Sequence, residues 1–160
     1  MNFHDPISPA ASDMSEPVRF HFQVSLNEEH AYLKIACNQG AEIDLGERVH
    51  HYSLLTLARR RLDDAARGVD PSSQGWVDAH QLSRMLGLDP ACLNIQIFRA
   101  RRQIARALPS GARLPDIVER RRGELRLGAL AFRIVRGSLI EGECVPAGAA
   151  PVRVMPCNGA

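Results

Sequence analysis

The chain has 160 residues, of which 45% are apolar and 24% charged, and this composition is typical of one folded domain with short tails. No apolar run approaches the ~20 residues that a transmembrane helix requires, so a helical membrane protein is excluded. The first residues, MNFHDPISPAASDMSEP, lack the basic start and apolar stretch of a secretory signal. The four cysteines are scattered, which favours reduced thiols over a disulfide framework or a zinc site. We therefore expect a cytoplasmic protein.

Charge is distributed unevenly along the chain. Residues 1–83 carry 7 Lys/Arg and 12 Asp/Glu, a net charge of −5, whereas residues 84–136 carry 12 Arg and 4 acidic residues, a net charge of +8. Arginine outnumbers lysine by 19 to 1, and a compositional bias of the source explains that choice of residue type. Such a bias does not explain the clustering, which indicates binding to nucleic acid.

The N-terminal part predicts a small antiparallel sheet. Residues 1–18 are rich in Pro, Ser and Asp, and we expect them to form a disordered arm. Apolar and polar residues then alternate over 19–26 and again over 31–37, with a polar turn between them. This pattern predicts a β-hairpin, followed by a short third strand over 41–44.

A long helix is expected next, over residues 47–67. Its apolar stripe at three- to four-residue spacing comprises Val49, Tyr52, Leu55, Leu62 and Ala66, widened by Leu54 and Ala58. Gly68 is typical of the position after a helix end, and residues 70–75 predict a loop. Trp76, just beyond that loop, is expected to anchor the core.

Two further helices are predicted close together. Asp78 and Gln81 resemble a capping box for a helix over 79–86. Gly87 ends that helix, and Asp89 with Pro90 opens the next one, which reaches Leu108. Two helices separated by a three-residue turn that contains Gly make a helix-turn-helix.

The last of these helices has two distinct faces on a helical wheel. The residues expected to be buried are Leu93, Ile97, Ala100, Ile104 and Leu108. The candidate DNA-binding residues on the opposite face and its flank are Asn94, Ile95, Phe98, Arg99, Arg101, Arg102 and Arg106. Arg can pair with guanine, Asn with adenine, and Ile can contact a thymine methyl group, while other arginines neutralise phosphates. A solvated basic face is the alternative, but exposed Ile95 and Phe98 need a partner, either a base or another protein.

Beyond Pro109 the alternating pattern returns. Segments 117–120 and 124–127 flank Arg121-Arg122-Gly123, which predicts a hairpin with a cationic tip. Arg120, Arg121 and Arg122 are therefore candidates for binding an adjacent minor groove. One more strand is expected over 131–135, and residues 137–160 are rich in Gly, Pro and Ala and predict a flexible tail.

The order of three strands, three helices and a hairpin resembles the winged helix-turn-helix effector domain of OmpR/PhoB-type response regulators. The segment LNIQIFRARRQI (93–104) looks like that family's recognition-helix pattern V-D-V-H-I-x-R-L-R-x-K-L. A closer resemblance is to the winged-helix region that follows the FHA domain in many bacterial FHA proteins. It is carried by NEEH (27–30), DLG (44–46), HHY (50–52), LTLARRR (55–61), QGWV (74–77) and IVERR (117–121).

The resemblance covers about residues 19–135 and has clear implications for fold and function. It implies an α+β fold: a winged helix-turn-helix domain over 19–136 with an N-terminal antiparallel β-sheet, three helices and a C-terminal β-hairpin wing. The function implied is a sequence-specific DNA-binding transcriptional regulator that binds double-stranded DNA, and we expect it to depart from the family in lacking a receiver domain. Position 98 departs from the pattern, because the regulators usually carry a polar or basic residue where this chain has Phe.

Other kinds of site are not expected. His50 and His51 are neighbours on the predicted helix, so their side chains should diverge by about 100° and not bind one metal ion. Asp63 and Asp64, with the arginines before them, predict surface ion pairs. No catalytic or nucleotide-binding fingerprint occurs, so we expect neither an enzyme nor a cofactor. The alternative function is a winged-helix adaptor whose Ile95/Phe98 face binds another protein; whether DNA is bound by a homodimer stays open.

Overall fold

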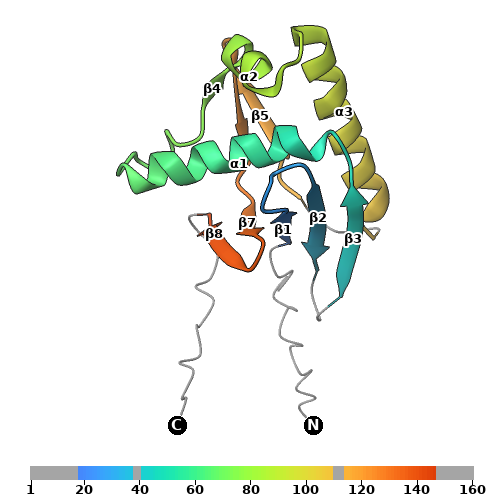
Figure 1. The fold of residues 1–160 in the computed structure, drawn as a ribbon. Helices are drawn as coiled ribbons and strands as arrows, with labels where there is room; N and C mark the ends of the chain where they lie inside the picture. The colour runs from blue at the N-terminus through green and yellow to red at the C-terminus, as the bar shows by residue number, and fades with distance from the viewer. Residues whose placement is uncertain (1–17, 38–40, 110–113, 147–160) are drawn as a thin grey trace, which may run out of the picture.

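The computed structural model describes residues 18–37, 41–109 and 114–146. Residues 1–17 of the expected arm and 147–160 of the expected tail lie outside this part. In chain order, the elements are β1 (Arg19–Val24), β2 (Ala31–Ala36), β3 (Glu42–Glu47), α1 (His51–Ala66), β4 (Val77–Asp78), α2 (Ala79–Leu86), α3 (Pro90–Ala107), β5 (Val118–Arg121), β6 (Glu124–Leu127), β7 (Ala131–Arg136) and β8 (Leu139–Cys144). The fold is α+β, with antiparallel strands first, three helices next and hairpin strands last, as the sequence predicted (Figure 1).

The larger of two sheets joins both ends of the described chain. Its strand order is β3-β2-β1-β7-β8, with β1 antiparallel to β2 and parallel to β7. The alternation in β1 buries Phe20, Phe22 and Val24 on one face, as predicted. The smaller sheet has the order β4-β6-β5. The parallel β1–β7 pair makes the larger sheet mixed, which no local sequence pattern indicated.

The prediction of a flexible tail from residue 137 is wrong for residues 139–144, which form β8. This strand is antiparallel to β7, and Glu143 on β8 forms an ion pair with Arg133 on β7 at 2.5 Å. The turn between the two strands contains Gly137, whose φ is +61°, a left-handed conformation that favours glycine. The glycine that suggested the start of a tail is thus the turn of a hairpin.

The first helix starts later than predicted and buries a different set of residues. β3 runs on to Glu47, which pairs with Tyr32 of β2, and α1 begins only at His51. Val49, placed on the apolar stripe by the sequence, therefore lies before the helix and is 70% exposed. Ala66, at the other end of the stripe, is exposed as well. The buried apolar residues of α1 are Leu54, Leu55, Leu57 and Ala58.

The predicted ion pairing in α1 forms in part, since Asp64 pairs with Arg60 at 3.4 Å, but Arg61 and Asp64 are buried and not on the surface. α1 packs between the two sheets, in contact with β2 and β8 of the larger one and β6 of the smaller one (Figure 1). Arg61 donates a hydrogen bond from Nη1 to the Gly128 carbonyl at 2.7 Å. Asp64 accepts one from the Gly75 N–H at 2.8 Å. Because both sides of the helix are covered, these polar side chains tie α1 to the loops around it.

Candidate nucleic-acid interface

Two capping carboxylates and a left-handed glycine fix the position of α3. The Gln81 N–H donates to Asp78 Oδ1 at 3.0 Å, and Gly87 ends α2 with a φ of +65°. The Cys92 N–H donates to Asp89 Oδ1 at 2.8 Å, with Pro90 as the first helical residue. These predicted signals are confirmed, and they place α3 against the core directly after α2.

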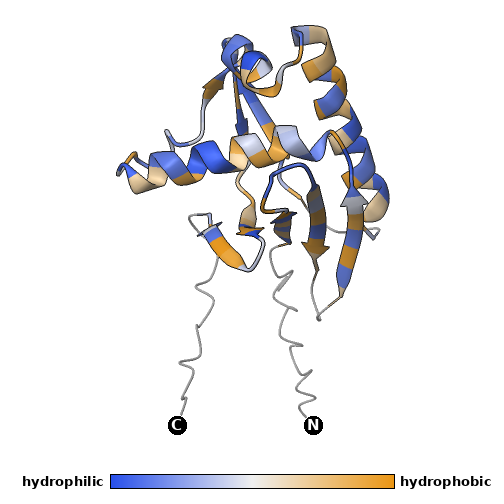
Figure 2. Cartoon of the chain, in the orientation of Figure 1, coloured by the Kyte–Doolittle hydropathy of each residue, from blue (hydrophilic) through white to orange (hydrophobic). Residues whose placement is uncertain are grey.

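The two faces of α3 lie where the helical wheel placed them. Leu93, Ile97, Ala100 and Ile104 are buried, whereas Leu108, also predicted to be buried, is the half-buried residue after the helix. The exposed residues are Asn94, Ile95, Phe98, Arg99, Arg102 and Arg106. Over its 18 residues the helix carries four arginines and no acidic residue, and hydrophilic and hydrophobic segments follow one another along it (Figure 2). No described carboxylate forms an ion pair with Arg99, Arg102 or Arg106, so this face keeps its positive charge.

The hairpin of β5 and β6 packs beside one edge of α3. Arg120 on β5 donates from Nη2 to Asn94 Oδ1 at 3.0 Å. Arg101 reaches the same strand, where it donates from Nη2 to the Val118 carbonyl at 2.6 Å and contacts Asp116 at 3.2 Å. The structure therefore brings the two predicted groups of residues together, and it gives Arg101 a structural contact to the hairpin instead of a free guanidinium.

The tip of the hairpin is shorter than predicted. β5 continues through Arg121, which is paired with Glu124 of β6, so the turn itself is Arg122-Gly123. Arg121 also forms an ion pair with Glu124, at 2.7 Å. Arg122 has no ion pair within the described residues and lies at the turn, so it is the arginine of this group that is free to meet a ligand.

Trp76 is a partly exposed platform for arginines and not a buried core anchor. The Cζ atoms of Arg121 and Arg126 lie 4.1 and 4.4 Å from the centroid of its ring. Both distances are within the range of cation–π attraction. Arg126 in turn forms an ion pair with Glu119 at 2.6 Å. Arg121 is thus held by a carboxylate and an aromatic ring, which stiffen the hairpin below its tip.

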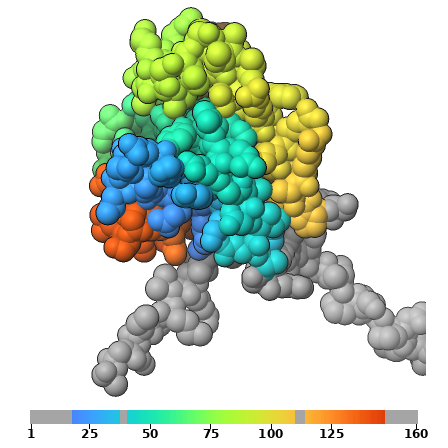
Figure 3. All heavy atoms as spheres, turned by 45° about the vertical axis from the view of Figure 1, so that its right-hand side comes forward, coloured from blue at the N-terminus to red at the C-terminus, as the bar shows by residue number. Residues whose placement is uncertain are grey.

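A groove of about 630 Å³ lies along the other edge of α3, where this helix meets the residues that precede α1. Its lining comprises Arg48, Val49, His50, Gln96, Arg99, Arg102, Gln103, Arg106 and Ala107. In the space-filling view, residues of β3 and the start of α1 (teal) lie directly beside α3 (yellow) (Figure 3). Arg48 is the basic residue of this groove that the sequence analysis missed. Its position before α1 gave no signal, because only the packing of α1 against α3 brings it to this face.

One glutamine side chain joins the two walls of the groove. Gln103 Oε1 accepts hydrogen bonds from His50 Nε2 at 2.6 Å and from His51 Nε2 at 2.9 Å. Gln103 Nε2 donates to the Leu45 carbonyl at 3.1 Å. Burial lowers the pKa of His51, so the neutral imidazole is favoured. The position of Gln103 at the edge of the buried face of α3 is the sequence signal that could have identified it as a residue that contacts another element.

The expectation that His50 and His51 diverge is wrong. Their rings lie 4.9 Å apart in an edge-to-face arrangement, and both contact the same oxygen of Gln103. His50, the N-cap, has helical dihedral angles (φ −68°, ψ −12°), so the backbone does not bring the rings together, whereas the Gln103 oxygen that both rings contact does. In the described part of the chain, no group of three or more His, Cys, Asp or Glu side chains is arranged to hold a metal ion.

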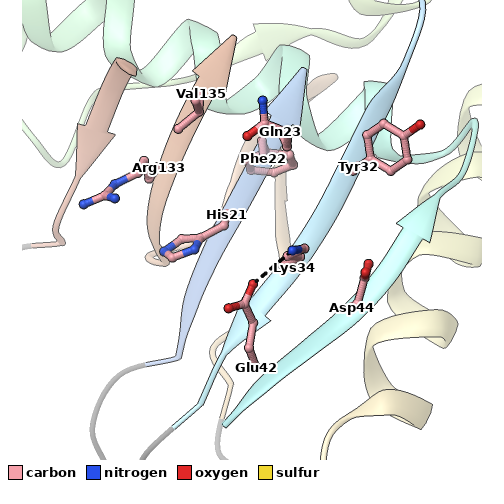
Figure 4. A pocket seen from close by; sticks show the side chains of 9 residues that line it. All are labelled: His21, Phe22, Gln23, Tyr32, Lys34, Glu42, Asp44, Arg133 and Val135. Atoms are coloured by element: carbon pink, nitrogen blue, oxygen red, sulfur yellow. Dashed lines mark ion pairs between the residues drawn. The ribbon is translucent and has the colours of Figure 1, made fainter. Parts of the chain in front are cut away.

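A second hollow, of about 390 Å³, lies on the outer face of the larger sheet (Figure 4). Its lining contains two basic residues, Lys34 and Arg133, and two acidic ones, Glu42 and Asp44, and Lys34 pairs with Glu42 at 3.6 Å. Burial and the nearby Arg133 lower the pKa of His21 in this hollow. The paired charges give it no excess of either sign, unlike the groove beside α3.

Comparison with protein-family models, with curated proteins and with solved structures yields no match. None of the helices in the described ranges combines the length and hydrophobicity needed to cross a membrane.

Proposed function

We propose that this chain is a sequence-specific DNA-binding regulator of the winged helix-turn-helix type, with α3 in the major groove and the β5–β6 hairpin as its wing. The observation that carries the proposal is the exposed face of α3. It presents arginines without an acidic neighbour on the helix, directly beside a hairpin that ends in Arg122. DNA binders place such a face in the major groove, where guanidinium groups reach both base edges and phosphates.

The contacts of α3 refine the roles of its residues. Asn94 accepts a hydrogen bond from Arg120 through Oδ1, so one of the two lone pairs of that oxygen is engaged by the hairpin before any base is bound. Arg101 is held by the Val118 carbonyl. Base reading therefore falls to Arg99 and Arg102, whose guanidinium groups have no described ion pair and whose Nη atoms match guanine O6 and N7.

One observation favours a second candidate function, a winged-helix adaptor that binds another protein. Ile95 and Phe98 are 48% and 60% exposed on the same face as the arginines. An exposed aromatic residue next to an aliphatic one is typical of the centre of a protein interface. On DNA, the same side chains would contact thymine methyl groups and sugars.

The proposal is tested by the binding of a fluorescent 20-base-pair duplex of mixed sequence at two salt concentrations. With about four phosphate contacts, the affinity of the wild-type protein should fall roughly 100-fold between 50 and 200 mM salt, because bound counterions are released. The matched control is Arg136→Ala, which removes one exposed arginine at the end of β7, beside Glu28. This control should leave the slope unchanged. Weak binding that ignores salt would refute the proposal.

Substitutions at neighbouring positions separate the two candidate functions. If DNA is the ligand, Arg99→Ala should weaken discrimination at one base pair of a sequence selected from a random pool by about 1–3 kcal/mol. Phe98→Ala should then change affinity less. A Phe98→Ala variant that keeps DNA affinity but loses a protein partner favours the adaptor, since a desolvated aromatic residue would then be the binding hot spot.

A further inference from the structure

The groove beside α3 is positively charged on both walls. Arg48 lines one wall, and Arg99, Arg102 and Arg106 line the other, while no acidic residue lines it. Arg48 bonds to the Glu47 carbonyl through Nη1 at 2.7 Å, which leaves its other N–H groups available. Val49 and Ala107 are the apolar residues of the lining, and the aliphatic stems of the arginines add apolar surface between the guanidinium groups. Its chemistry suits an anion with exposed oxygens.

The start of α1 adds to this positive potential. The N-terminal end of a helix carries a partial positive charge from its aligned peptide dipoles, and in α1 this charge acts without free donors at His51 and Tyr52, whose N–H groups donate to the Arg48 and Val49 carbonyls. α1 is 16 residues long, and its first turn contains no acidic residue that would neutralise this charge. The side chain of the N-cap, His50, makes no capping bond and is committed instead to Gln103. The helix end and the four arginines therefore act on the same groove.

The groove and the hairpin lie on opposite edges of α3. Asn94 and Arg101 contact the hairpin, whereas Gln103 contacts the residues at the start of α1. A helix in the major groove, which is about 12 Å wide, has one phosphate backbone on each side. The hairpin can meet only the backbone on its own side. Arg48 and Arg106 lie in the groove where the other backbone would pass, beside the base-reading Arg99 and Arg102.

We propose that Arg48 and Arg106, with the start of α1, bind the DNA phosphate backbone on the side of the major groove opposite the hairpin. This inference rests on the proposed function and adds an element, α1, to the DNA-binding surface. Gln103 is the positioning residue, because its bonds to His50 and His51 hold the start of α1 against α3. The two backbones would thus be held from both edges of α3, which fixes the orientation of the helix in the groove.

The experiment uses the full chain and the mixed-sequence 20-base-pair duplex over a range of salt concentrations. Each lost phosphate contact should reduce the slope of log affinity against log salt by about 0.9. The double variant Arg48→Ala/Arg106→Ala should therefore lower the slope by about 1.8, while Arg48→Lys/Arg106→Lys should restore it because lysine also neutralises phosphate. Arg136→Ala serves as the matched control, with an unchanged slope.

A second measurement locates the phosphates that Arg48 and Arg122 contact. Single methylphosphonate substitutions, which remove the charge of one phosphate, are scanned along a duplex selected by the wild type. At a phosphate that Arg48 contacts, neutralisation should weaken binding of the wild type but not of Arg48→Ala. The phosphates identified in this way for Arg48 should lie across the major groove from those identified with Arg122→Ala. If both sets lie on the same side, the inference is wrong.

The outcomes also separate this inference from the proposed function. If the wild type binds DNA and Arg122→Ala reduces the slope, but Arg48→Ala/Arg106→Ala does not, the α1 contact is refuted and the proposed function stands. If the wild type binds no duplex at low salt, both fail together.

Discussion

Ile97 and Phe98 are neighbours in sequence but lie on opposite faces of α3, so they test the orientation on which the DNA-binding surface depends. Ile97 is 1% exposed within the hydrophobic core. Ile97→Ala removes three methyl or methylene groups worth about 0.8 kcal/mol each on burial, or about 2.4 kcal/mol. The cavity left behind adds to this loss, which places the expected decrease in unfolding free energy at about 2–5 kcal/mol.

The assay is thermal and urea-induced unfolding followed by circular dichroism. Because 1 kcal/mol lowers the midpoint of a domain of this size by roughly 4 °C, Ile97→Ala should lower it by at least about 8 °C. Phe98→Ala, at a position that is 60% exposed, and Arg102→Ala, also exposed, should change the unfolding free energy by no more than about 0.5 kcal/mol.

Equal losses in Ile97→Ala and Phe98→Ala would refute this orientation of α3. A larger loss in Phe98→Ala would mean that the helix is rotated. Arg99 and Arg102 would then not be presented together, and the proposed DNA-binding surface would not exist.

Three further outcomes are expected. Gln103→Leu should lower the unfolding free energy by about 1–3 kcal/mol in urea unfolding, because His50 and His51 lose their shared acceptor. The same variant should weaken DNA binding, because the start of α1 is displaced. Asp64→Ala should cost about 2 kcal/mol by the same measurement, since the buried Gly75 N–H loses its acceptor. Stability should fall as pH drops below about 6.5, because burial lowers the pKa of His51 and the unfolded chain then binds more protons than the folded one. His51→Gln should make this pH dependence shallower, and an unchanged pH profile in that variant would rule out His51 as its source.

Local sequence signals identified the elements whose ends are fixed by their own residues. Asp78 and Asp89 cap α2 and α3 through bonds to N–H groups three residues on, and such bonds depend on nothing outside the helix. The alternation in β1 and the spacing of Leu93 and Ile97 in α3 likewise follow from the period of each element. These patterns were sufficient to predict which face of α3 is exposed.

The errors occurred where long-range packing overrides a local pattern. Val49 has the spacing of a buried helical residue, but the pairing of β3 with β2 delays the start of α1 until His51 and leaves Val49 exposed. Arg61 and Asp64 look like surface residues, but two sheets cover α1, where Arg61 Nη1 donates to the Gly128 carbonyl and Asp64 accepts from the Gly75 N–H. Local periodicity cannot register a neighbour that comes from a distant part of the chain.

The same distinction holds for the candidate binding surface. The sequence by itself determined the basic, partly apolar face of α3, because charge clustering and helical period are properties of one segment. Only the tertiary structure decided which arginines are available, since Arg101 and Arg121 are held by contacts with β5 and β6. It also decided that Arg48, 51 residues before Arg99 in the chain, lies beside α3. That proximity depends on the packing of α1 against α3, where Gln103 joins segments that no sequence pattern connects.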